Sequence, residues 1–150
     1  GESISKVKSR FHVSKSRYEF TDKDIPAILL NVKSSNPAVK EILIAVYQSR
    51  IYQIQIFFSE VSEANFEALK NEISNKYGHE MDLGLDGIIM GGERAAFNPR
   101  IDGIETMIVI EYSSEIMDNQ LFVKYIHVPL NDKMNSDKLS RKASKFSDQL

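Results

Sequence analysis

Apolar and polar residues alternate along several short stretches of the chain, and this alternation is typical of strands with one buried face. Three stretches rich in β-branched and aromatic residues cover 27–33, 41–47 and 50–58. A Ser-Ser-Asn-Pro segment separates the first two, and the pair Gln48-Ser49 separates the last two. We therefore predict three strands, of which the second and third form a hairpin. In the third, apolar residues alternate with glutamines, so one face should be buried and the other at least half wet.

A different period, with apolar residues three or four positions apart, predicts a helix over residues 62–78. Ser62 can cap the start of this helix, and Gly78 can end it in a left-handed conformation. Its buried stripe should consist of Phe66, Leu69, Ile73 and Tyr77.

The same period predicts a helix near each end of the chain. The first covers residues 3–11, with Ile4, Val7 and Phe11 on one side. The last runs from about residue 135 to 150. Its apolar face is formed by Leu139, Ala143, Phe146 and Leu150.

Extended patterns return after the central helix, at 93–97, 105–113 and 120–130, with a turn around 117–119. The predicted order is therefore helix, three strands, helix, three strands, helix. We expect one α+β domain over residues 1–150, whose halves, 1–60 and 61–150, repeat this pattern without repeating residue identities. The hairpins imply an antiparallel sheet, and the helices are expected to pack on one face of it.

Short motifs along the chain resemble one group of known proteins. The chain opens with Gly1, Ser3 and Val7 in a Gly-x-Ser-x-x-x-Val helix start, continues with the strand IYQIQIFF, and ends its central helix in Lys-Tyr-Gly. MIVIEYSS, LFVKYIHVPL and a final helix follow. This pattern resembles small bacterial extracytoplasmic proteins with the architecture of the β-lactamase inhibitor protein and of the outer-membrane assembly lipoproteins of the SmpA/BamE type. The resemblance implies a periplasmic or secreted, non-enzymatic protein that acts by surface contact, and it carries no binding residue onto this chain.

Charge and cysteine content exclude only extreme classes of protein. The formal net charge is −2, which gives no general attraction to nucleic acid or to an anionic membrane. The chain has no cysteine, so disulfides and thiol nucleophiles are excluded, but the compartment is not fixed. No apolar run approaches the ~20 residues of a membrane span. Gly1 in place of an initiator Met indicates a remnant of tag removal, so a signal peptide or lipid anchor could have been trimmed.

The stretch LGLDGIIMGGERAAF, residues 83–97, contains four of the chain's seven glycines. It follows a helix and fits neither GxGxxG nor GxxxxGK, so a connecting loop is favoured over a phosphate site. It is unusually apolar for a connection. Such a segment more commonly folds back over the core, and the alternative is a contact for a partner protein. The residues that would form this contact are Leu83, Leu85, Ile88, Ile89 and Met90.

The pattern of titratable residues points to no metal or cofactor. The three histidines form no HxH or HExxH motif. His79, Glu80, Asp82 and Asp86 could converge on a metal ion, but their spacing misses the calcium-loop pattern. A solvated acidic loop is the ordinary interpretation of these residues, and we predict neither a metal nor a cofactor.

No motif for catalysis stands out either. The chain has no Gly-x-Ser-x-Gly sequence. Glu105 with Glu111, or Asp102 with Glu93, could supply the paired carboxylates of an acid and a base, but strand alternation makes the first pair ordinary solvated residues. We therefore predict no catalytic residue.

Charge is unevenly distributed along the chain. Residues 6–17 carry five basic groups and no acid, whereas residues 60–86 carry seven acids against two lysines. The basic groups are expected on the outer faces of amphipathic helices, so nucleic-acid binding is not favoured. This bipolar arrangement suits a protein partner, a membrane headgroup layer touched by the C-terminal helix, or nothing beyond solubility.

Three hypotheses for function follow. The first is a non-enzymatic binding, assembly or inhibitor protein of the bacterial envelope, which presents a sheet face and the 83–90 loop to another protein. The second is an enzyme or small-ligand protein with a pocket between sheet and helices. The third is a cytoplasmic regulator or immunity-type inhibitor that uses the same surfaces.

Overall fold

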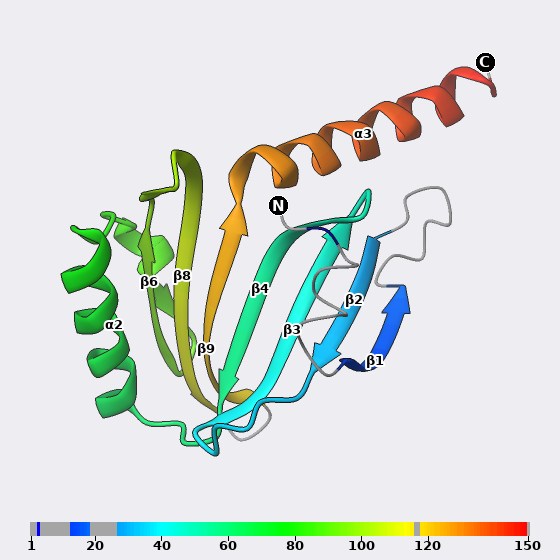
Figure 1. Cartoon of the computed structure of the whole chain (residues 1–150). Helices are drawn as coiled ribbons and strands as arrows, with labels where there is room; N and C mark the ends of the chain where they lie inside the picture. The colour runs from blue at the N-terminus through cyan, green and yellow to red at the C-terminus, as the bar shows by residue number, and fades with distance from the viewer. Residues whose placement is uncertain (1–2, 4–12, 19–26, 116–117, 150) are drawn as a thin grey trace.

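The computed structural model describes residues 3, 13–18, 27–115 and 118–149. Its centre is one antiparallel sheet whose strands follow the order β1-β2-β3-β4-β9-β8-β6-β5 (Figure 1). A short strand outside this path, β7 (Arg100–Ile101), pairs with β8. The strands of the sheet are β1 (Val13–Tyr18), β2 (Ala27–Val32), β3 (Val39–Tyr47), β4 (Arg50–Phe58), β5 (Ile88–Ile89), β6 (Gly92–Phe97), β8 (Ile104–Glu115) and β9 (Asp118–His127).

The composition of β3 requires both faces of the sheet to be covered. Its alternating residues belong to two apolar sets, Ile42, Ile44 and Val46 in one and Leu43, Ala45 and Tyr47 in the other. Successive side chains of a strand point to opposite faces, so each face carries a packed core. The predicted hairpin turn at Gln48-Ser49 joins β3 to β4, with φ of 49° and 62° at these residues.

Helix α2 (Glu63–Tyr77) covers one face at the end of the sheet formed by β6 and β8. The Ser62 hydroxyl accepts a hydrogen bond from the Asn65 backbone N–H at 3.1 Å and caps the helix. Phe66 and Ile73 are buried, while Leu69 and Tyr77 pack beside them, which confirms the predicted stripe. Their core partners are Ala95, Phe97, Ile108, Ile110, Leu121 and Val123.

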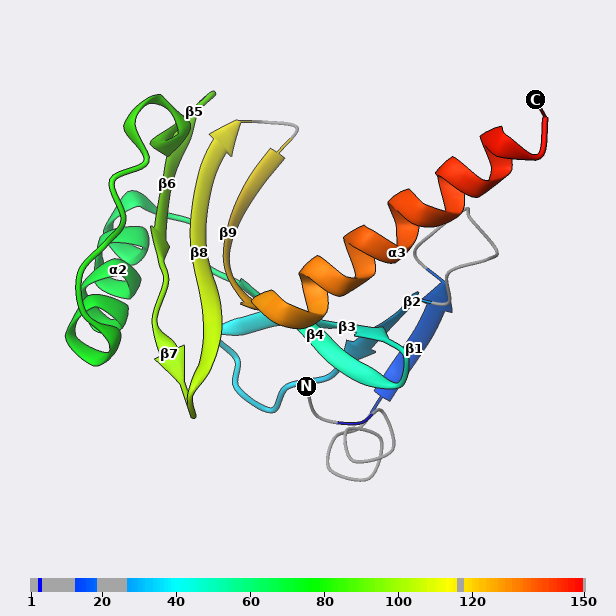
Figure 2. The same ribbon diagram turned by 90° about the horizontal axis from the view of Figure 1, so that it is seen from above.

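Helix α3 (Val128–Ser147) lies on the opposite face. Its Met134 is buried against Tyr47 and Tyr52. The other set of β3 residues lies on the same side of the sheet as α2, because Ile42 pairs with Ile56, which packs against the α2 core. Figure 2 shows the two helices on the two sides of the sheet. The α+β class, the antiparallel sheet and the C-terminal helix are confirmed, but the helices do not share one face as predicted, since both faces of β3 are apolar.

The junction between β9 and α3 lies earlier than predicted. The strand was expected to reach residue 130 and the helix to start near 135, whereas β9 ends at His127 and α3 begins at Val128. Pro129 fits the first turn of a helix, where its missing N–H costs no hydrogen bond. His127 Nδ1 accepts a hydrogen bond from the Leu130 backbone N–H at 3.2 Å and caps the helix.

The remaining differences concern the first part of the chain and the turn before β9. The sequence pattern predicted no strand over residues 13–18, where β1 pairs antiparallel with β2. The predicted helix over 3–11 lies outside the described residues except for Ser3, which forms an isolated bridge with Arg50. Of the turn predicted at 117–119, Asp118 already belongs to β9.

Among the helices that the structure describes, none combines the length and the apolar content needed to cross a membrane.

Replacing Phe66 by Ala should lower the free energy of unfolding by about 3–5 kcal/mol, because it removes a buried ring from the α2 core. Phe146→Ala is the matched control. Phe146 is exposed, so its truncation should change stability by less than ~0.5 kcal/mol. Urea unfolding followed by circular dichroism measures both, and equal losses would contradict the described core.

Candidate functional site

Exposed apolar side chains gather where the chain connects α2 to β6. This connection contains the short helix η1 (Gly84–Gly87) and β5, which forms a small hairpin with β6. Leu85, Ile88 and Met90 are 86%, 72% and 83% exposed, and Met81 is also exposed. We call Met81, Leu85, Ile88 and Met90 the hairpin knob. Large apolar side chains are more often buried, so their exposure along one segment at a sheet edge makes this segment a candidate contact surface.

The exposure of the knob residues corrects one expectation from the sequence. Of the five residues proposed for a partner contact, Leu83 and Ile89 are half-buried, and the other three are exposed. The favoured alternative, in which this segment folds back over the core, is therefore wrong for Leu85, Ile88 and Met90. Leu83 and Ile89 are half-buried, while these three side chains are exposed to solvent.

Two glycines give the hairpin its shape. Gly91 has φ of 72°, a turn conformation that other residues rarely adopt. Gly92 lies so close to β8 that a Cβ there would overlap the carbonyl oxygen of Tyr112. The turn is fastened to β8 because Ser114 donates from its backbone N–H and its hydroxyl to the Gly91 carbonyl, at 3.0 and 2.9 Å. The glycine-rich stretch therefore builds a tight hairpin.

Arg94 holds η1 against the sheet. Its guanidinium forms an ion pair with Glu111 on β8, with N–O distances of 3.0 and 3.1 Å, and donates to the Asp86 carbonyl at 3.5 Å. Within η1, the Gly84 N–H donates to the Asp82 carboxylate at 3.0 Å. These contacts fix the backbone that carries Leu85 and Ile88. A surface that is ordered before binding loses less conformational entropy when a partner docks.

An open groove of about 730 Å³ lies beside the knob, between the connection and β6. The side chains that give it its character are the carboxylates of Glu80, Asp82 and Glu93 and the apolar groups of Met81, Leu83 and Ile88. Arg94 also lines it, but its charge is paired with Glu111. The knob and groove together form an apolar and acidic surface.

The candidate metal ligands do not converge. In the part of the chain that the structure describes, which includes 79–86, no three His, Asp or Glu side chains are close enough to hold a metal ion. Asp82 instead caps the turn before η1. His79 and Asp86 are exposed. The acidic segment is therefore a source of surface charge.

The proposed carboxylate pairs are also separated. Glu105 and Glu111 lie on β8 six residues apart, which is about 20 Å at the rise of a strand. The two carboxylates of a glycosidase lie only about 5–10 Å apart. Glu93 pairs with Tyr112 near one end of β8, whereas Asp102 precedes the other end. Neither pair can act as an acid and a base on one substrate.

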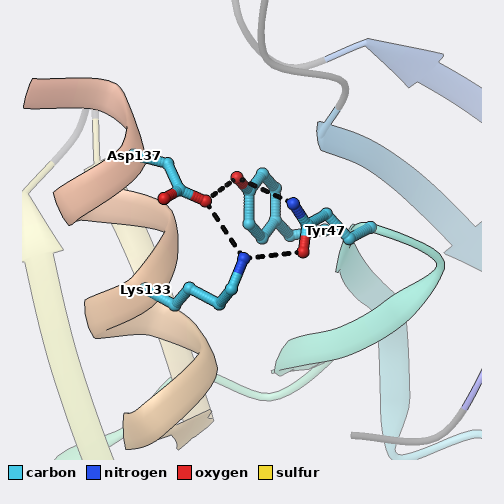
Figure 3. Close-up of polar contacts among 4 residues, drawn as sticks. Tyr47, Lys133 and Asp137 are labelled. Carbon is cyan, nitrogen blue, oxygen red and sulfur yellow. Dashed lines mark hydrogen bonds and ion pairs between the residues drawn. The ribbon is translucent and has the colours of Figure 1, made fainter. Parts of the chain in front are cut away.

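A polar cluster joins α3 to the β3–β4 hairpin (Figure 3). The buried Tyr47 hydroxyl donates to the Asp137 carboxylate at 2.5 Å, and Lys133 donates to the same oxygen at 3.2 Å. Lys133 also donates to the Gln48 side-chain oxygen at 2.8 Å. Each group is occupied by a partner within the cluster, so these residues fasten α3 to the sheet.

Two other hollows offer less for chemistry. One of about 580 Å³ lies between α2, the turn at Ala38 before β3 and the end of β4 at Phe58, and its described lining is mainly apolar. The other, of about 290 Å³, is lined in part by Tyr125 and His127. Burial raises the pKa of Tyr125 and lowers the pKa of His127. His127 caps α3 through its Nδ1, which ties its ring to the start of the helix.

Gly92→Ala should lower the free energy of unfolding by about 1–3 kcal/mol, because the added methyl meets the β8 backbone. Gly87→Ala is the matched control, since its Cβ would make only ordinary contacts, at 3.5 Å or more, and should change stability by less than ~0.5 kcal/mol. Urea unfolding of the two variants tests this. A Gly92→Ala protein as stable as the control would show that the hairpin does not approach β8 this closely.

Tyr47→Phe should make stability less dependent on pH. Burial, followed by the hydrogen bond to Asp137, raises the pKa of Tyr47 to about 12. The contribution of the Tyr47 hydroxyl to the free energy of unfolding is therefore present below pH ~10 and is lost as the pH rises through 12. The hydrogen bond from Tyr47 lowers the pKa of Asp137. The contribution of the Asp137 carboxylate to the free energy of unfolding is therefore present above pH ~4 and is lost as the pH falls.

The stability difference between wild type and Tyr47→Phe should therefore be largest between about pH 5 and 9 and shrink on either side. Urea unfolding across this range measures it. Tyr112→Phe is the control, because the Tyr112 ring packs on Phe66 instead of on a carboxylate. A pH-independent difference at Tyr47 would contradict its bond to Asp137.

No protein-family model, no curated protein and no solved structure matches this chain. The resemblance to the β-lactamase-inhibitor and SmpA/BamE architectures therefore stays a prediction from the sequence.

Proposed function

We propose that this chain is a non-enzymatic protein-binding domain that contacts its partner through the hairpin knob. One observation carries the proposal: Leu85, Ile88 and Met90 are large, apolar and almost fully exposed on an ordered edge of the sheet. An apolar contact gains free energy as these side chains leave water, by roughly 25 cal/mol for each Å² buried. The acidic groove beside them adds a charge preference for a basic partner.

The alternative function, small-ligand binding, would use the hollow of about 580 Å³ beside α2. Its mainly apolar lining suits an apolar molecule. Its described lining residues include Glu60 and Glu72 but no Lys, Arg or His that could bind a carboxylate or phosphate. This hollow supports ligand binding less strongly than the knob supports a protein contact.

A location in the bacterial envelope, periplasmic or secreted, is the second part of the proposal. It is supported by the sequence resemblance described above. Fractionation of the source cells tests it separately, because recovery of the protein in the cytosol would contradict this part and leave the knob proposal in place.

A photo-crosslinking side chain at Met90 should trap one defined protein in living cells. The same group at Asn71, an exposed residue of α2, is the matched control and should trap little. Ile88→Asp in the Met90 variant should remove the product, because a carboxylate in the apolar contact is costly to desolvate. Equal crosslinking from Met90 and Asn71 would contradict the proposed surface.

A further inference from the structure

The second half of α3 presents an apolar stripe to solvent. Leu139 is 68% and Phe146 70% exposed. Residues nine apart in a helix point in opposite directions, because nine residues make two and a half turns. Leu139 comes nine residues after Leu130, which packs on the sheet, and Phe146 comes nine after Asp137, which accepts the Tyr47 hydrogen bond. The stripe therefore lies on the side of α3 turned away from its own sheet.

This half of the helix, residues 138–147, also extends beyond the sheet (Figures 1 and 2), and we call it the α3 arm. Two stripes with the spacing i, i+4, i+7 run side by side along it. One is basic and the other apolar: Lys138, Lys142 and Lys145, and Leu139, Ala143 and Phe146. The α3 arm is thus the end of a basic amphipathic helix whose apolar side has no cover from the described sheet.

The groove beside the hairpin knob has the complementary chemistry. It places the carboxylates of Glu80, Asp82 and Glu93 beside the apolar groups of Met81 and Ile88. A groove of this kind suits an amphipathic basic helix. β5 is the last strand at one edge of the sheet, and the α3 arm extends away on the other side of the molecule (Figure 2). One copy's arm therefore reaches only another copy's groove.

We propose that the α3 arm of one copy docks in the groove beside the hairpin knob of a second copy. This inference rests on the proposed function and names the partner. The contact joins two different surfaces, so every open assembly keeps one unoccupied arm and one unoccupied groove. Association therefore continues into chains or closes into a ring. Both surfaces are small, so the association should be weak and salt-sensitive. A membrane suits the arm less well, because the chain is acidic overall and the stripe has few large side chains.

Sedimentation velocity of the wild-type protein over a roughly hundredfold dilution series is the first measurement. The mean mass should rise above the 17.1 kDa monomer as the concentration increases, and it should fall again on adding salt. A wild-type protein that stays monomeric throughout would overturn the inference.

Two pairs of variants locate the contact. Leu139→Gln with Phe146→Gln should abolish self-association, whereas Ser140→Gln with Ser144→Gln, on the same helix but off the stripe, should not. Met81→Lys with Ile88→Lys changes the groove and should also abolish self-association. Its control, Asn71→Lys with Asn75→Lys, adds the same charge on exposed positions of α2 and should not. All of these positions are exposed, so the variants should fold.

Mixing the two interface variants gives the sharpest test. The arm variant retains a groove and the groove variant retains an arm, so an equimolar mixture should form dimers and nothing larger. A mixture that stays monomeric would exclude a head-to-tail contact between arm and groove. If the protein does not self-associate but its arm binds vesicles of anionic phosphatidylglycerol, the arm docks on a membrane and not on a second copy, and the inference is overturned.

The same experiments separate this inference from the proposed function. If the protein stays monomeric while Met90 still crosslinks to a different protein, the knob remains a contact surface and only the choice of partner is wrong. If Met90 crosslinks no better than Asn71 and the protein is monomeric, both proposals fail.

Discussion

The antiparallel pairing of β4 with β9 is the contact on which the rest of this structure depends. It joins the strands of the first half of the chain to those of the second half in one sheet, from Gln53 opposite Ile126 to Phe57 opposite Phe122. With this pairing in place, β5 and its hairpin lie at one edge of the sheet and α3 starts over the middle. The distance between the two proposed contact surfaces is thus a consequence of strand order.

Both surfaces are held by polar contacts to a strand or hairpin. Arg94 ties η1 to Glu111 on β8, so the knob is ordered although its apolar side chains are exposed. Tyr47 ties the first half of α3 to the β3–β4 hairpin through Asp137. In each case a fixed base carries an exposed apolar group, which is the arrangement expected of a surface organised before its partner arrives.

Much of the fold could be predicted from periodicity, because burial on one side leaves a clear period in the sequence. The α2 stripe and the hairpin over β3 and β4 are of this kind. The boundary at His127 was missed because a strand ending in apolar residues and a helix beginning with them look alike, although Pro129 was a usable signal. β1 was missed because its sequence, VSKSRY, is mostly polar and its pairing with β2 is a tertiary effect.

The candidate site was only partly predictable. The apolar character of residues 83–90 was visible, but a buried connection and an exposed one have the same composition. The hairpin geometry set by Gly91 and Gly92 decides between them. That geometry depends on contacts with β8, a strand that comes later in the chain. The α3 stripe has the same limit: the period locates a stripe, while only the sheet contacts of Leu130 and Met134 show which side of the helix faces inward.

The most direct measurement is a series of methyl NMR spectra of the protein at rising concentration. The central claim is that the exposed apolar groups of the knob and groove of one copy meet those of the α3 arm of another copy. It predicts that the methyl signals of Ile88, Met90 and Leu139 shift together, while buried methyls such as those of Ile108 and Ile110 stay unchanged. Methyl signals of the knob and arm that do not move, or shifts scattered over unrelated residues, would contradict the account.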